Sequence, residues 1–158
     1  MLSRAEGGKV AVPLEAVLAE LTELKRYIDA LQTQINGFTA ELEELSASRS
    51  LIAELKARGV RETVIPTDRG RHVMVRARLA EDNTVLAHVG LDYYVKLSFD
   101  KAIEILNVKE SDIREAIKEL QKELSNMLAY YQQLQAVVNR AVSEVRQGAT
   151  RSSTEAKQ

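Results

Sequence analysis

The sequence predicts an α+β fold, in which a long antiparallel two-helix coiled coil carries two β-hairpins between its helices. Apolar residues recur three and four positions apart over residues 14–58 and again over residues 99–147. Between them, over residues 59–98, the apolar period changes to two. The first pattern is typical of coiled coils, and the second, with turns every few residues, favours antiparallel hairpins.

The first heptad segment, residues 14–58, follows residues 1–13, which we interpret as a flexible N-terminal tail and tip. Arg49 falls where the next core residue is due. Lys56 and Arg58 in the last turn, followed by Gly59, predict a helix end with a left-handed glycine cap. The seam consists of Leu14, Val17, Leu21, Leu24, Ile28, Leu31, Ile35, Phe38, Leu42 and Leu45.

Residues 59–98 read as four short strands, at 63–66, 72–79, 84–89 and 93–97. Two isolated hairpins are marginally stable in water, so their apolar face should meet another sheet. We therefore predict that this segment mediates oligomerisation. The candidate interface residues are Val64, Val73, Val75, Ala77, Leu79, Val85, Ala87, Val89, Tyr93 and Val95.

The second heptad segment, residues 99–147, begins after Ser98, a suitable N-cap. Glu110 occupies a core-phase position in it. Residues 148–158 are rich in Ser and Thr and are predicted to be a disordered tail. Antiparallel pairing of two helices of matched length would bring Leu14 near Val145.

Composition argues against several classes of function. The chain has no Cys, a net charge of −1 and no apolar run of the roughly 18 residues that a membrane span needs. We expect a cytoplasmic protein without cofactor, metal or membrane association. No phosphate-binding loop, nucleophile elbow or plausible acid pair is present, so we expect no enzyme and no ATP hydrolysis.

Two clusters of polar residues have less specific interpretations. Four arginines at 69, 71, 76 and 78 could form a nucleic-acid patch, but acidic residues lie nearby and stacking aromatics are missing from that face. A solvated or intersubunit face is the preferred interpretation. His72 and His88 lie on separate strands without a third ligand nearby, which does not favour a metal site.

Apolar residues exceed the needs of the seam at the end where both termini lie. Such a surplus marks a binding surface for exposed apolar segments of other proteins, or a wider packing stripe between the two helices. The sequence leaves both alternatives open. The candidate client-binding residues are Val10, Val12, Leu14, Val17, Leu18, Val137, Val138, Val142 and Val145.

The central stretch resembles the alpha-class subunits of the prefoldin family. The motifs are Val64-Ile65-Pro66, the Val75–Leu79 strand, the Val-rich strand that ends at Gly90, and Tyr93-Tyr94-Val95. Four strands between the helices point to the alpha class, and the resemblance covers roughly residues 14–147. The family often has Gly-x-Gly before the tyrosines, where this chain has Gly90-Leu91-Asp92, which puts the geometry of that turn in doubt.

The resemblance implies an ATP-independent chaperone subunit of archaeal type. Two alpha subunits would join through their sheets, and four beta-type subunits would complete a hetero-hexamer whose hairpins form an intersubunit β-barrel. Coiled-coil tips would capture non-native proteins and transfer them to a group II chaperonin. The alternatives are a structural coiled-coil scaffold that binds no client and a coiled coil associated with nucleic acid.

Overall fold

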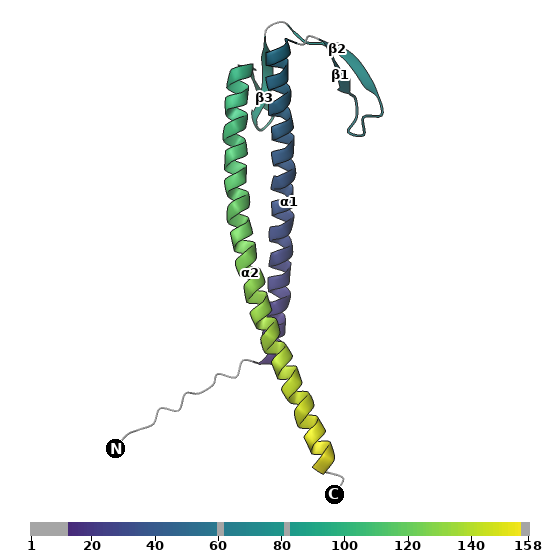
Figure 1. Cartoon of the computed structure of the whole chain (residues 1–158), viewed down its shortest axis with the longest axis vertical. Helices are drawn as coiled ribbons and strands as arrows, with labels where there is room; N and C mark the ends of the chain where they lie inside the picture. The colour runs from purple at the N-terminus through teal and green to yellow at the C-terminus, as the bar shows by residue number, and fades with distance from the viewer. Residues whose placement is uncertain (1–12, 60–61, 81–82, 156–158) are drawn as a thin grey trace, which may run out of the picture. The chain divides into compact units, whose positions relative to one another are not determined.

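The computed structural model describes residues 13–59, 62–80 and 83–155 (Figure 1). Two long helices, α1 (Leu14–Arg58) and α2 (Phe99–Glu155), enclose four strands in the sequence. The strands are β1 (Glu62–Pro66), β2 (Met74–Arg78), β3 (Thr84–Gly90) and β4 (Tyr93–Ser98). Strand β1 pairs antiparallel with β2, and β3 pairs antiparallel with β4. The predicted class, two long helices with two antiparallel hairpins between them, is confirmed.

The chain divides into two compact units, and each helix contributes to both. The helical unit comprises Met1–Ile35 and Glu119–Gln158, and the hairpin unit comprises Asn36–Lys118. We describe each unit separately.

The helical unit is held together by the seam of α1 against α2. Val17, Leu24, Leu31 and Ile35 are buried, at the spacing of one face of a helix. Each buried Leu or Ile contributes about 1.5–3 kcal/mol relative to an exposed side chain. The facing residues of α2 are half-buried, as expected of a two-helix structure: Leu120, Leu124, Met127, Tyr131 and Leu134.

The hairpin unit has defined helix ends. The amide of Gly59 donates to the carbonyl of Leu55 at 3.0 Å, and Gly59 has a φ of 62°, which confirms the predicted glycine cap. At the start of α2, the amide of Lys101 donates to Ser98 Oγ at 3.3 Å, which confirms the N-cap. Ala102 is buried behind this first turn.

Helix α2 extends farther than the sequence predicted. It continues through Gly148 to Glu155, where a disordered tail from 148 was expected. Once a helix is nucleated, each added residue gains a hydrogen bond, so one glycine costs only about 1 kcal/mol without ending it. The serines and threonines of this segment favour caps and turns, which predicts a loop, although they are tolerated in helices.

Leu91, in the turn between β3 and β4, has a φ of 47° and is 85% exposed. The left-handed region costs a residue with a Cβ roughly 1–2 kcal/mol, whereas glycine enters it freely. We expect Leu91→Gly to raise the free energy of unfolding by about 0.5–1 kcal/mol, after the entropy of the added glycine is deducted. Thermal unfolding followed by circular dichroism measures this effect.

Leu86→Gly is the matched control, because Leu86 is also exposed but lies within strand β3. A glycine at this position relieves no left-handed backbone conformation, so Leu86→Gly should lower the free energy of unfolding by about 0.5–1 kcal/mol. Equal losses for the two variants would show that the backbone of Leu91 is not strained.

Candidate functional site

The predicted client-binding residues that the structure describes all lie in the helical unit. Val10 and Val12 lie outside the described residues. Val17 is buried in the seam, and Val138 is half-buried. The others are exposed to solvent: Leu14, Leu18, Val137, Val142 and Val145.

Two tyrosine–carboxylate hydrogen bonds fix the register of the helical unit. The Tyr27 hydroxyl donates to the Glu123 carboxylate, and the Tyr130 hydroxyl donates to the Glu20 carboxylate. The two bonds lie one heptad apart on each helix. In one the tyrosine is on α1 and the carboxylate on α2, and in the other the tyrosine is on α2 and the carboxylate on α1. Leu14 precedes Glu20 by six residues, so this register brings it beside roughly residues 136–141 of α2.

The register leaves the end of α2 without a described helix beside it. In Figure 1 the yellow end of α2 continues beyond the purple start of α1. Val145, which lies beyond the stretch beside Leu14, is accordingly 70% exposed. The expected proximity of Leu14 to Val145 stays a prediction; α1 has 45 residues and α2 has 57, so the two helices are not matched in length.

The hydrogen bonds from Tyr27 and Tyr130 also predict sensitivity to alkaline pH. The bond to Glu123 raises the pKa of Tyr27 above its ordinary value of 10.0, and Glu20 does the same for Tyr130. Above pH 10 the unfolded chain therefore loses protons that the folded chain retains, so stability falls as pH rises. The contribution is complete below pH 10 and disappears as pH passes the folded-state pKa.

We expect the urea midpoint of the chain to fall between pH 10 and the folded-state pKa of these tyrosines. The variant Tyr27→Phe/Tyr130→Phe should show a shallower fall, because it lacks both hydroxyls. Circular dichroism at 222 nm in buffered urea series would measure both profiles. Parallel profiles for the two proteins would contradict the assignment.

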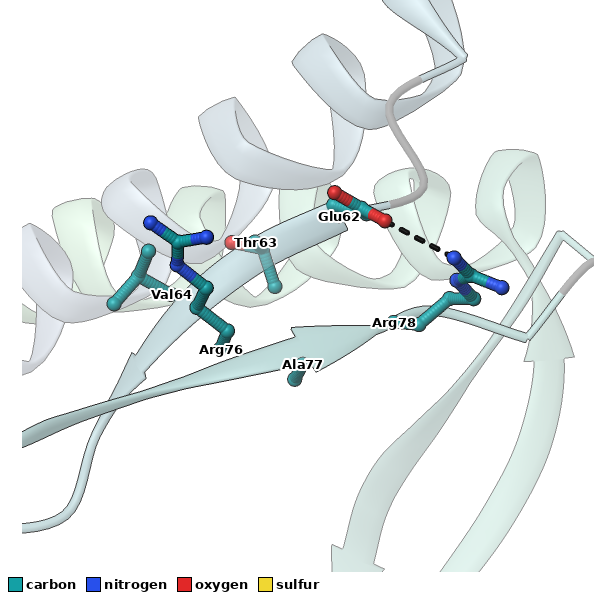
Figure 2. Close-up of a pocket in the computed structure, with 6 residues that line it drawn as sticks. All are labelled: Glu62, Thr63, Val64, Arg76, Ala77 and Arg78. Carbon is teal, nitrogen blue, oxygen red and sulfur yellow. Dashed lines mark hydrogen bonds and ion pairs between the residues drawn. The ribbon is translucent and has the colours of Figure 1, made fainter.

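The first hairpin has one charged and one apolar face. Val64 pairs with Arg76 and Glu62 with Arg78, whereas Ile65 pairs with Val75. Glu62 and Arg78 form an ion pair, with 3.2 Å between Glu62 Oε1 and an Arg78 guanidinium nitrogen (Figure 2). Figure 2 also shows that the Ala77 side chain projects away from that of Arg76. Both partners of the ion pair are exposed, so it contributes at most about 1 kcal/mol.

This register places the predicted interface residues of the first hairpin on two different faces. Val64 lies on the charged face, across from Arg76. Ile65, which the sequence did not include, lies on the apolar face with Val75 and Ala77 and is 45% exposed. The strict alternation of β1 with β2 is the signal that could have found it, once the pairing partners are known.

The second hairpin also has two faces. Val85 pairs with Leu97 and Ala87 with Val95, which places these four residues together. The opposite face carries Leu86, which is 70% exposed, and an aromatic contact in which the rings of His88 and Tyr94 lie 5.2 Å apart. The predicted residues Val89, Tyr93 and Val95 are exposed, and Leu79, Val85 and Ala87 are half-buried.

A groove of about 540 Å³ lies in the hairpin unit between α1, β3 and α2. Apolar side chains from all three elements line it, and Glu41, Glu44, His88 and Lys109 are at its polar positions. Its apolar lining includes Leu45, Leu51, Ile52, Val85, Leu86, Ala87, Ala102, Ile105 and Leu106.

The turn between β1 and β2 is organised by Asp68. Its Oδ1 accepts from the His72 amide at 3.2 Å and lies 2.9 Å from His72 Nδ1, while its Oδ2 accepts from the Val73 amide at 3.3 Å. The bond from the His72 backbone is the main reason that the pKa of Asp68 is lowered. The arrangement explains His72 as a turn residue.

Within the described residues, no three His, Cys, Asp or Glu side chains gather as a metal site would require. Neither helix contains, in its described part, a stretch long and apolar enough to span a membrane.

Comparison with known proteins gives a consistent result. The family model described as "Prefoldin subunit" matches residues 24–144. "Prefoldin subunit alpha" of Sulfurisphaera tokodaii is 32% identical over 139 residues, which cover 87% of this chain and 89% of that protein. The protein of the same name from Saccharolobus solfataricus is 27% identical over 150 residues, covering 95% and 97%. That from Metallosphaera sedula is 27% identical over 133 residues, covering 84% and 92%.

Proposed function

Because the chain belongs to the prefoldin family of chaperone subunits and is similar over most of its length to alpha subunits, we propose that it captures non-native proteins at the end of its helical unit. It does so without ATP and transfers them to a group II chaperonin. The observation that carries this proposal is the exposure of four apolar side chains, Leu18, Val137, Val142 and Val145, near the end where α2 continues past α1.

An apolar surface at a helix end suits a holdase. Non-native proteins expose apolar segments, and burial of apolar area is the general driving force for their association. Each contact with so few side chains is weak, but several arms in one assembly provide avidity. No site for a nucleotide is needed, because the client can leave when a stronger binding partner competes for it.

Assembly with other prefoldin subunits accompanies this role. We propose a hetero-hexamer of two alpha and four beta-type subunits in the cytoplasm, joined through the hairpins as an intersubunit β-barrel. The exposed apolar residues Ile65, Val73 and Val75 of the first hairpin and Val89, Tyr93 and Val95 of the second support it. Such surfaces are costly when they remain in water.

One experiment tests capture and assembly together. The full chain is mixed with a candidate beta-type subunit, and light scattering after size exclusion gives the assembled mass. The same sample is assayed for suppression of aggregation of a chemically denatured protein. We expect a mass of six subunits and suppression without ATP.

A truncated chain that lacks residues 1–18 and 137–158 provides the comparison. Mixed with the same intact beta-type subunit, it should still assemble to a hexamer, in which the two alpha subunits are truncated, and suppression should fall. Full suppression by the truncated assembly would refute capture at this end. Assembly without suppression by either chain would favour the scaffold alternative, and salt-sensitive binding of labelled DNA would favour the third.

A further inference from the structure

The seams of α1 and α2 each contain one charged residue, and the two meet in the hairpin unit. Arg49 Nε donates to Glu110 Oε1 at 2.8 Å, and the Glu110 side chain is only 8% exposed. Arg114, one turn further along α2, places its guanidinium 3.8 Å from the other carboxylate oxygen. Both charges were visible in the sequence as interruptions of separate heptad patterns, but their pairing was not.

We propose that the Arg49–Glu110 ion pair is the specificity element that selects antiparallel pairing of α1 with α2 of the same chain, in one register. A polar residue at a core position of a coiled coil lowers stability but restricts the register and the choice of partner. The Arg49–Glu110 pair is part-buried, with Arg49 35% exposed, and we infer that it acts in the same way, because an apolar pair would often be more stable but less selective. This proposal does not depend on client capture.

The sequence around the pair shows how it excludes one register. If α2 slipped by one heptad toward the start of α1, Arg49 would lie against Ile103 and Glu110 against Leu42. Both of these partners are apolar seam residues. Arg49 would then lose Glu110 and face an apolar side chain, and Glu110 would keep only its longer contact with Arg114 on its own helix. Burial of an unpaired charge is among the most costly changes in a protein interior.

A slip in the opposite direction is also disfavoured. It would place Arg49 against Ile117 and Glu110 near Lys56. Lys56 forms an ion pair with Asp100 in the observed register. This slip would therefore break the Lys56–Asp100 pair and leave Arg49 against an apolar side chain.

The same pair acts against association between helices of different copies. In a parallel pair of two α1 helices, Arg49 would face Arg49 of the second copy, and two α2 helices would bring two Glu110 carboxylates together. Like charges at facing core positions are repulsive. This matters for a prefoldin subunit, because assembly with other subunits brings several heptad-patterned helices together.

The test uses distances within the full chain, which contains no native Cys. Ala47→Cys on α1 and Asp112→Cys on α2 supply spin-label sites at two exposed positions of the hairpin unit. Pulsed electron resonance gives the distance distribution, and light scattering gives the mass. The parent chain should show one narrow distance.

Three variants test the role of the Arg49–Glu110 pair. In Arg49→Leu/Glu110→Leu the helices remain paired, but a second distance population or a higher mass should appear. Arg49→Glu alone should lower the melting temperature and broaden the distribution, because two carboxylates then face each other. The exchanged pair, Arg49→Glu/Glu110→Arg, should recover both the narrow distance and most of the lost melting temperature.

Two results would overturn the proposal. One is a leucine variant with the parent's single distance and mass, since the charges would then select nothing. The other is an exchanged pair that melts as low as Arg49→Glu, since the two residues would then not act through their mutual attraction.

Discussion

Replacement of Leu18, Val137 and Val145 by glutamine is expected to weaken aggregation suppression by the assembled protein. These side chains are 46%, 55% and 70% exposed, so the helical unit does not need them for its core. Glutamine keeps good helix propensity, which preserves α1 and α2. The variant therefore removes apolar surface from the proposed client-binding end without removing the end itself.

The expected size of this effect follows from the area removed. A partly buried apolar contact contributes on the order of 1 kcal/mol, or about fivefold in affinity, and three such contacts are lost on the arm of each alpha subunit. Because several arms bind one client, the losses combine. We expect the concentration needed for half-maximal suppression to rise by at least about tenfold.

The matched control is Val108→Gln/Leu128→Gln. Val108 is 56% exposed and Leu128 is 42% exposed, so the chemical change is similar, but both residues lie elsewhere on α2. Light scattering of a denatured client, titrated with each assembly, compares the variants. A loss of suppression in the control as large as that in the end variant would mean that general surface hydrophobicity, and not this end, holds the client.

The sequence determined the elements far better than it determined their contacts. The seam residues, the Gly59 cap and the Ser98 N-cap depend on periodicity and on interactions within a few residues, and all of these are visible in one chain. The pairing of Tyr27 with Glu123 joins residues that are 96 positions apart and so could not be read from local pattern. The same limit concealed the partnership of Arg49 with Glu110.

The candidate site shows this limit in its residues. The sequence identified an apolar surplus near the termini, but could not separate Val17, which is buried, from Leu18, which is exposed, because that depends on where α1 faces α2. It also included Val64 in the interface set and omitted Ile65. A strand presents alternate residues to opposite faces, so that choice required the register of β1 with β2.

Replacement of Leu31 by alanine is expected to destabilise the helical unit more than any change at an exposed position. Leu31 is 4% exposed and lies between Leu24 and Ile35 on the buried face of α1. The substitution loses the transfer free energy of the removed carbons and leaves a cavity, because the neighbouring seam residues are held by their own helices. We expect a loss of about 2–5 kcal/mol.

The consequence of that loss depends on the shape of the core. The buried residues of α1 form a single line, so a defect at Leu31 has no second layer of packing to compensate for it. The free energy of unfolding of a typical domain is only about 5–15 kcal/mol. A loss of this size should therefore separate α1 from α2 at moderate temperature. Leu51→Ala is the control, because Leu51 is 54% exposed and should change stability by only about 0.5 kcal/mol.

Thermal and urea unfolding, followed by circular dichroism, would measure both variants. If Leu31→Ala lost no more stability than Leu51→Ala, the seam would not be what holds the helical unit together. The result would also bear on function, because the proposed client-binding end is presented by two helices at once. A Leu31→Ala assembly that melts early but retains suppression would show that α2 alone can hold a client.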